Sequence, residues 1–153
     1  MVLRRYAPSD HETVRALHVN GLAQFGADAG LGPWDADIDR IPEVYLDNHG
    51  EFLVGEIGGA VVAIGGLRRV DQHVAEIKRM RVRLDYQRQG LGGELLRALE
   101  RRAQELGYRT LRLDTTVQQI PAQKLYERNG YLRVGSAVLG GYQCILYSKE
   151  LTL

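Results

Sequence analysis

Three glycines and an arginine near the middle of the chain form a candidate site for an anion. The stretch Gln87-Arg88-Gln89-Gly90-Leu91-Gly92-Gly93 lies between a predicted strand at 74–84 and a predicted helix at 91–106. Backbone N–H groups at a helix start are unpaired, and the helix dipole favours an anion there. Glycine also lets the backbone approach a ligand closely. The stretch matches neither the dinucleotide-binding fingerprint nor the P-loop. It is either a phosphate-binding turn or a glycine-rich helix entry without a ligand.

Carboxylates supply the other candidate chemistry. Glu76 lies in the middle of a predicted strand, where it is either a functional group or a cross-strand partner for a nearby lysine or arginine. A second group of acids surrounds Trp34 in and after a glycine-rich loop at 26–33: Asp28, Asp35, Asp37 and Asp39. These acids either select a cationic substrate or are ordinary solvated carboxylates.

Composition sets limits on the function. The 153 residues fit one domain with a sizeable core, and the charged fraction of 25% is ordinary for a globular protein. A net charge of +1 argues against binding of nucleic acid driven by bulk charge. The single Cys144 and four scattered histidines predict neither a disulfide nor a metal site. We expect no membrane span and no signal peptide, and therefore a cytoplasmic location.

The elements that position these residues follow from periodicity and turn residues. The predicted helices are at about 9–25, 41–48, 91–106 and 121–129, and the predicted strands are at 2–6, 51–57, 60–70, 74–84, 109–115, 131–134 and 142–151. A glycine-rich loop is expected at 135–141. The strand–helix–strand unit at 74–115 implies a right-handed parallel crossover beside an antiparallel meander.

This order of elements, with two motifs, resembles the GNAT superfamily of acetyl-CoA-dependent N-acetyltransferases. The motifs are Gln87-x-x-Gly90-x-Gly92 and Ala122-x-x-Leu125-Tyr126-x-x-x-Gly130-Tyr131, and the run from Glu76 to Val82 also looks like the family's fourth strand. The resemblance implies an α/β GNAT (acyl-CoA N-acyltransferase) fold. In it a mixed, mostly antiparallel split sheet is flanked by helices, with one N-acetyltransferase domain over 1–153. It also implies a bulge in the fourth strand, which splays from the fifth.

The same resemblance implies a site for acetyl-CoA. The loop from Arg88 to Gly93 would bind the pyrophosphate, and backbone groups of the fourth strand would bind the pantetheine arm as an added strand does. Gln119 stands where the family often has asparagine, which puts that pantetheine contact in question. The expected cofactor-binding residues are Met80, Arg81, Val82, Gln87, Arg88, Gln89, Gly90, Leu91, Gly92, Gly93 and Gln119.

Two catalytic residues are expected at the reactive end. An amine must lose a proton before it attacks a thioester, and Glu76 would accept that proton directly or through water. Tyr126 matches the family's tyrosine that protonates the leaving thiolate; the alternative is a core tyrosine. The backbone N–H near Met80 would stabilise an oxyanion. Cys144 is interpreted as a core residue, so a covalent acyl-cysteine route is not expected.

The predicted function is transfer of an acetyl group to a primary amine by direct attack in a ternary complex. The acceptor is a small molecule or a protein, and the acids near Trp34 favour a polyamine-, aminoglycoside- or lysine-like amine. A homodimer is possible. The alternatives are transfer of another acyl group, and a non-catalytic acyl-CoA sensor or partner-binding module. A nucleic-acid-binding role for Arg79, Arg81, Arg83 and Arg88 fits the net charge poorly; these arginines are expected to face cofactor phosphates or local acids.

Overall fold

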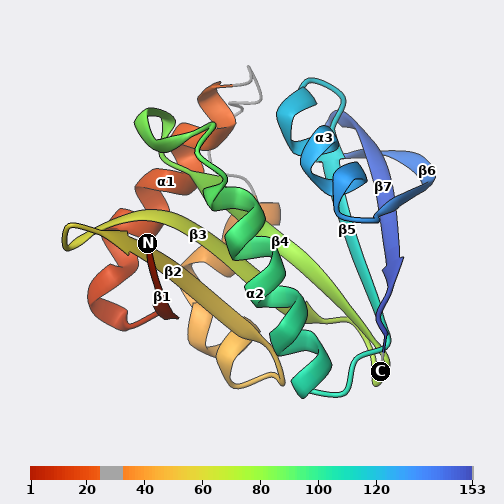
Figure 1. Cartoon of the computed structure of the whole chain (residues 1–153), viewed down its shortest axis with the longest axis horizontal. Helices are drawn as coiled ribbons and strands as arrows, with labels where there is room; N and C mark the ends of the chain where they lie inside the picture. Colours follow the sequence, from red (N-terminus) through yellow and green to blue (C-terminus); the bar gives the residue numbers. More distant parts are fainter. Residues whose placement is uncertain (25–32, 153) are drawn as a thin grey trace.

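A seven-stranded mixed sheet forms the centre of the computed structural model, which describes residues 1–24 and 33–152 (Figure 1). The strand order is β1-β2-β3-β4-β5-β7-β6, and β4 and β5 are parallel whereas the other neighbours are antiparallel. The strands are β1 (Val2–Arg5), β2 (Glu51–Ile57), β3 (Ala60–Arg69), β4 (Val74–Val82), β5 (Thr110–Thr116), β6 (Leu132–Leu139) and β7 (Tyr142–Glu150). The predicted α/β fold with a mostly antiparallel sheet is confirmed.

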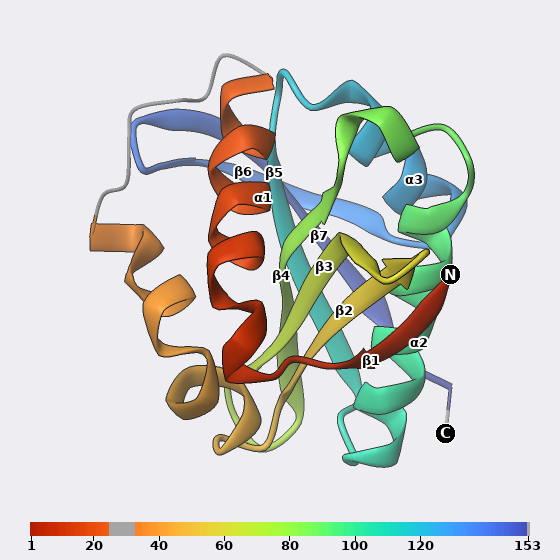
Figure 2. The same ribbon diagram turned by 90° about the vertical axis from the view of Figure 1, so that its left-hand side faces the viewer.

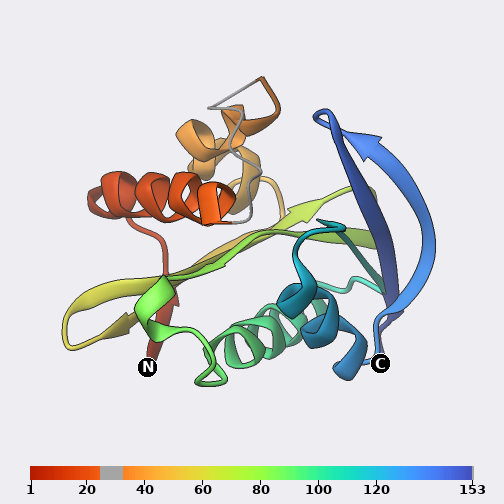
Figure 3. The same ribbon diagram turned by 90° about the horizontal axis from the view of Figure 1, so that it is seen from above.

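Helices cover both faces of the sheet (Figure 3). On one face lie α1 (His11–Gln24), the 3₁₀ helix η2 (Pro33–Arg40) and the π-helical turn η3 (Pro42–Leu46); on the other lie α2 (Leu91–Glu105) and α3 (Ile120–Arg128). Two short 3₁₀ turns, η1 (Pro8–Asp10) and η4 (Leu84–Tyr86), join the elements. In Figure 2 α1 and α2 lie on opposite sides of the sheet, and α1 contacts β3 and β4.

Each face has its own core. Leu95 and Leu99, one turn apart on α2, are fully buried with Leu111 and Tyr147 of the sheet. This i, i+4 spacing is what makes the segment an amphipathic helix. Val14 of α1 belongs to the second core, on the opposite face. Full burial of one such side chain contributes roughly 1.5–3 kcal/mol, so both helical layers are tied to the sheet.

The middle of the sheet is bulged and then split. Arg79 has a φ of 61°, and Arg79 and Met80 together lie opposite Gly65, because the register passes from Gly66↔Lys78 to Ile64↔Arg81. Pairing of β4 with β5 covers only residues 74–76 and 110–112, after which the two strands diverge (Figure 1). The bulge and the splay that the sequence resemblance implies are therefore both present. Within the described part of the chain, the β5-facing edge of β4 has no strand partner beyond Glu76.

Two sequence-based expectations are corrected. The predicted loop at 135–141 is mostly strand: β6 continues to Leu139 and turns at Gly140 and Gly141, both at positive φ. Gly135 follows a bulge in β6, because the register with β7 shifts between Arg133 and Gly135. The predicted helix at 41–48 is instead the pair η2 and η3, which begins earlier, at Pro33.

Candidate active site

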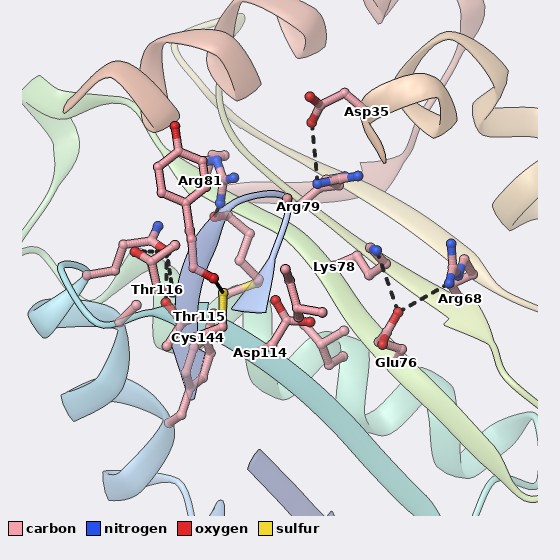
Figure 4. Close-up of a pocket in the computed structure, with 18 residues that line it drawn as sticks. Asp35, Arg68, Glu76, Lys78, Arg79, Arg81, Asp114, Thr115, Thr116 and Cys144 are labelled. Atoms are coloured by element: carbon pink, nitrogen blue, oxygen red, sulfur yellow. Dashed lines mark hydrogen bonds and ion pairs between the residues drawn. The ribbon is translucent and has the colours of Figure 1, made fainter. Parts of the chain in front are cut away.

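A cavity of about 420 Å³ lies where β4 and β5 separate (Figure 4). Its walls come mainly from β4, β5, α3 and the β6–β7 hairpin, with Arg68 of β3 and Asp35 of η2 at its border. Both predicted catalytic residues, Glu76 and Tyr126, line it, and so do Met80, Arg81 and Gln119 from the predicted cofactor set. The topology thus brings together side chains that are up to 50 residues apart in the chain.

Glu76 is mostly buried on β4. Its Oε1 lies 3.5 Å from Arg68 Nη2 and 3.6 Å from Lys78 Nζ, and this oxygen makes no hydrogen bond within the described structure. Arg68 is also its cross-strand partner in the β3–β4 register. The cross-strand pairing expected of Glu76 is present, and its place at the cavity is compatible with the functional interpretation.

Asp114 is a cavity carboxylate that the sequence analysis did not single out. It lies on β5 two residues beyond Arg112, which pairs with Glu76 at the last step of the parallel ladder. Asp114 is exposed to the open cavity, yet the protein around it partly desolvates its carboxylate. This desolvation, and then the negative charge of Glu76, raise the pKa of Asp114 above its ordinary value. The sequence contained a partial signal, because the predicted parallel pairing placed Asp114 on the strand next to that of Glu76.

Tyr126 is buried on α3, between other aromatic rings. Its ring lies edge-on to Tyr131 at 5.9 Å and tilted against Tyr147 at 6.0 Å. Burial raises the pKa of its phenol to about 12, while the charge of Arg81 opposes that shift. The phenol is therefore protonated at neutral pH and can act as a proton donor. The core and the catalytic interpretations of this tyrosine are compatible.

Two other predicted cofactor-binding residues, Gln119 and Val82, make hydrogen bonds within the protein. Gln119 Oε1 accepts hydrogen bonds from Thr116 N, at 3.1 Å, and from the hydroxyls of Thr115 and Thr116, so this oxygen is used to hold the β5–α3 turn. Val82 does not line the cavity; its carbonyl accepts a hydrogen bond from Gln87 Nε2 at 2.9 Å. Gln87 thus ties the glycine loop to the end of β4.

The glycine loop lies at the start of α2, outside the cavity. None of its residues at 87–93 lines that cavity. Gly90 caps α2 with a φ of 81°, and the first helical hydrogen bond runs from Glu94 N to Gly90 O. The N–H groups of residues 91–93 therefore have no acceptor within the helix. A Cβ at Gly92 would lie 3.3 Å from Leu125 Cδ2, so the helix start packs closely against α3.

These features fit the elongated acyl-CoA that the sequence resemblance implies. Unpaired N–H groups at the start of α2 suit a pyrophosphate, and the β5-facing edge of β4 that is free of strand pairing suits an extended amide arm. The cavity with Glu76, Asp114 and Tyr126 lies at this edge of β4, where the thioester of the acyl-CoA would have to be placed.

Of the acids near Trp34, Asp35 and Asp37 belong to a buried ion-pair network, whereas Asp39 is an exposed carboxylate beside His11 and Arg15, as the solvated interpretation predicts. Asp28 lies outside the described residues. Asp37 receives two hydrogen bonds from Arg79, at 2.9 and 2.6 Å, and one from Tyr45 at 2.6 Å. Burial raises the pKa of Asp37, but Arg79 outweighs it, so the net pKa is lowered. Asp35, although it borders the cavity, is buried against His18 at 2.7 Å and near Arg79.

His18 is fully buried on α1, as its position on the apolar helix face predicts. Burial and the charge of Arg81 lower its pKa to about 4, although Asp35 acts in the opposite direction. The ring is therefore neutral at pH 7, and Nε2 carries the proton that it donates to Asp35. Nδ1 has no hydrogen-bond partner within the described residues.

Other kinds of site find little support. Cys144 borders the cavity, but burial raises the pKa of its thiol, as expected of a core residue rather than a nucleophile. Within residues 1–24 and 33–152 no cluster of three or more potential metal ligands occurs. Among the described helices, none has the length and hydropathy to cross a membrane.

Comparison with known proteins gives consistent matches. The model of the acetyltransferase (GNAT) family matches residues 22–131, which include Glu76, the glycine loop and Tyr126. The Mus musculus protein named "Probable N-acetyltransferase family 8 member 5" is 35% identical over 104 residues, covering 65% of this chain. The chain spans only 46% of that relative's length.

Two further matches extend over most of the chain. The uncharacterized N-acetyltransferase YjgM of Escherichia coli (strain K12) is 26% identical over 142 residues, which are 90% of this chain and 85% of YjgM. The crystal structure of a GNAT-family acetyltransferase from Staphylococcus aureus Mu50 superposes with a TM-score of 0.90, at 21% identity and 99% coverage of both chains. At that identity the match supports the fold alone.

Proposed function

The chain belongs to the acetyltransferase (GNAT) family, as its motifs predict, and we propose that it transfers an acetyl group from acetyl-CoA to a primary amine. The observation that carries this proposal is a single cavity bordered by two carboxylates and a protonated phenol, Glu76, Asp114 and Tyr126, at the end of an unpaired strand edge. The proposed enzyme is one N-acetyltransferase domain over residues 1–153.

Binding of acetyl-CoA would use the glycine loop and β4. The N–H groups of residues 91–93 and the side chain of Arg88 would hold the pyrophosphate, and the positive φ of Gly90 keeps that turn open. The backbone of Met80 to Val82 would hydrogen-bond to the pantetheine arm. Gln87 supports this arrangement by fixing the loop to the carbonyl of Val82. Acetyl-CoA itself supplies the activated acetyl thioester.

Deprotonation of the amine falls to the carboxylates in the cavity. An ammonium is mostly protonated at neutral pH and must lose a proton before it can attack. Glu76 is held near Arg68 and Lys78, whereas Asp114 has a raised pKa and forms no ion pair with a described residue. A raised carboxyl pKa brings the group closer to neutral pH and makes it a stronger base. We assign the proton transfer to this pair, directly or through water, with Asp114 added to the predicted Glu76.

Tyr126 would donate a proton to the departing thiolate. Its phenol is protonated at neutral pH and borders the cavity, and the positive charge of Arg81 stabilises negative charge developing on its oxygen. The backbone N–H near Met80 would donate to the carbonyl oxygen as it gains charge. With both substrates bound in one cavity, no acyl-enzyme is required, and the high thiol pKa of Cys144 agrees with that.

The acceptor would be a small-molecule or protein amine. The rival proposals are transfer of a different acyl group, and a non-catalytic acyl-CoA sensor or partner-binding module with the same cleft. An assay of thiol release from acetyl-CoA, propionyl-CoA and succinyl-CoA with a panel of amines separates them. Amine-dependent thiol release fastest with acetyl-CoA supports the proposal. Binding of acetyl-CoA without turnover on any amine would favour the sensor.

A further inference from the structure

One of the four cationic side chains that border the cavity lacks an acidic partner among the described residues. Arg68 and Lys78 both lie within ion-pair distance of Glu76, and Arg79 is held by Asp37 and Asp35. Arg81 forms no ion pair with any carboxylate in residues 1–24 and 33–152, although it borders the same cavity. The cavity therefore contains one positive charge that the described structure does not neutralise.

The guanidinium of Arg81 is held in a definite position. Nη1 donates a hydrogen bond to the carbonyl of Met80 at 2.8 Å, and Nε is buried without a partner among the described residues. The side chain passes over α1 at Gly21, where a Cβ would lie 2.7 Å from Nε, so a larger residue there would displace it. Of the five N–H donors of the guanidinium, one is used within the described structure.

Such an arginine is costly unless an anion binds to it. Removing an unpaired charge from water carries a large penalty, and a well-placed counter-ion offsets it. Desolvation, and then the charge of Arg79, lower the pKa of Arg81 to about 10, so it remains a cation at neutral pH. A planar guanidinium pairs best with a carboxylate or a phosphate, through two parallel hydrogen bonds.

The surroundings select between these anions. Arg81 contacts the carbonyl of Met80, at the reactive end of the proposed site rather than at the glycine loop where phosphates would bind. Asp114 and Glu76, which would accept a proton from an ammonium, lie on the other side of the cavity from Arg81 (Figure 4). Asp35, the third carboxylate that borders the cavity, lies against His18 and Arg79. The cavity thus offers one cation and the two carboxylates of Glu76 and Asp114 to one small ligand, which is the charge pattern that complements a zwitterion.

We propose that the acceptor is an α-amino acid or a close analogue, and that Arg81 binds the carboxylate next to the amine that is acetylated. This inference rests on the proposed acetyl transfer. In that reaction one ammonium proton passes to the Asp114–Glu76 pair, and the C–N bond then forms as the C–S bond breaks. The thiolate takes a proton from Tyr126, and the second proton lost by the nitrogen returns to the Tyr126 oxygen, directly or through water. Arg81 bonds to no reacting atom; besides its electrostatic effect on the Tyr126 phenol, it orients the acceptor and selects it.

The test compares amino acids with the amines that lack their carboxylate. The pairs are L-alanine with ethylamine, L-phenylalanine with 2-phenylethylamine, and L-lysine with cadaverine. In the wild-type protein, kcat/KM for the amino acid of at least one pair should exceed that of its amine by about 10- to 100-fold. In Arg81→Gln that ratio should fall towards one. Arg81→Lys should restore part of it, and Arg83→Gln, which alters an exposed arginine paired with Asp85, should leave it unchanged.

A binding measurement separates failure of this inference from failure of the proposed function. Thermal unfolding of the CoA-loaded wild-type protein is followed with each amino acid and each amine, so no turnover is required. Turnover of amines without any preference for the carboxylate would overturn the role of Arg81 and leave acetyl transfer intact. Arg81-dependent stabilisation by amino acids without turnover would support the carboxylate subsite and overturn the enzyme. Stabilisation by none of the amino acids, together with no turnover, would overturn both.

A carboxylate on the acyl donor is the other source of the same chemistry. It is tested with ethylamine as acceptor and succinyl-CoA or acetyl-CoA as donor. If the wild-type protein prefers succinyl-CoA and Arg81→Gln abolishes that preference, Arg81 binds the carboxylate of the acyl donor. The acceptor proposal is then wrong. If Arg81→Gln lowers kcat/KM equally for both donors but keeps the preference for amino acids, the acceptor proposal is also contradicted.

Discussion

The carboxylates of Glu76 and Asp114 border one cavity from two parallel strands that have just separated. Glu76 lies at the last paired position of β4, and Asp114 lies two residues past its partner Arg112 on β5. After desolvation, the charge of Glu76 is the largest cause of the raised pKa of Asp114. The split in the sheet therefore does two things: it opens the cavity and places one acid where its ionised form is disfavoured.

Replacing Asp114 by asparagine should lower activity and raise stability. A base contributes about 10²–10⁴-fold to proton transfer, so we expect kcat to fall by at least about tenfold if Glu76 partly substitutes. The folded-state pKa of Asp114 is raised, so its ionised form opposes folding, and stability is lost as pH rises through that pKa. Asp114→Asn should therefore raise the melting temperature more at pH 7 than at pH 4.

Asp85→Asn is the matched control for that experiment. Asp85 is exposed and ion-paired with Arg83, and the hydrogen bond from Arg83 lowers its pKa, so the linkage has the opposite sign. Its replacement should not stabilise the protein at pH 7. A lower melting temperature in Asp114→Asn at pH 7, or an unchanged kcat, would contradict the assignment.

Tyr126→Phe should reduce kcat with little change in binding of acetyl-CoA. The substitution keeps the ring that packs on Tyr131 and Tyr147 but removes the proposed proton donor. We expect a loss of about 10²-fold in kcat, measured by thiol release, and an unchanged dissociation constant for CoA. Tyr108→Phe removes another buried phenol, one that donates to the carbonyl of His49 far from the cavity, and should cost stability but not kcat. Equal kcat in the two variants would show that Tyr126 contributes packing only and is not the proton donor.

Gly90→Ala should weaken binding of acetyl-CoA beyond its effect on stability. Gly90 has a φ of 81° and Gly59 a φ of 80°, and a Cβ would have open space at both. Alanine at either position should therefore destabilise the fold by about 1–2 kcal/mol through backbone strain. Only Gly90→Ala alters the turn that would bind the pyrophosphate, so only it should raise KM for acetyl-CoA. A similar KM in both variants would argue against the glycine loop as the phosphate site.

Acid should destabilise the protein through His18. Burial lowers the His18 pKa to about 4, whereas the unfolded chain has the ordinary value of 6.5. The unfolded state then binds more protons between these values, and stability falls as pH decreases from about 6.5 towards 4. At roughly 1.4 kcal/mol per pH unit, the full loss is roughly 3 kcal/mol. Urea unfolding from pH 7 to pH 4.5 measures it.

His18→Gln should have a flatter pH profile over that range, since Gln keeps an N–H donor for Asp35 and cannot titrate. His73→Gln, at an exposed histidine, should follow the wild-type profile. A His18→Gln profile as steep as that of the wild type would assign the acid sensitivity to other groups.

Short sequence patterns predicted the features that are determined by interactions between residues close in the chain. The leucines of α2 repeat at helical spacing, and the glycines before them match a helix start that needs a positive φ, so both features could be predicted. The hairpin at Gly58 and Gly59 follows from the same kind of evidence. The phosphate-binding role that we propose for the loop was inferred from the order of the elements around it, because the short motif alone matches no single fingerprint.

Features that depend on distant residues were beyond those patterns. Alternation along β4 predicts its faces only as far as Lys78, because the bulge at Arg79 arises opposite Gly65 of the neighbouring strand. Burial of Asp37 depends on Arg79, 42 residues away in sequence. The glycines after Tyr131 suggested a loop, whereas pairing with β7 extends the strand to Leu139.

The central claim is direct transfer of acetyl from acetyl-CoA to an amine in a ternary complex. Initial rates of thiol release, measured at several fixed concentrations of each substrate with L-phenylalanine, L-lysine and a plain amine as acceptors, test it most directly. The account predicts amine-dependent turnover, double-reciprocal lines that intersect, and no labelled protein after incubation with [acetyl-¹⁴C]acetyl-CoA alone. Parallel lines with a labelled acetyl-enzyme, or no turnover with any acceptor, would contradict it.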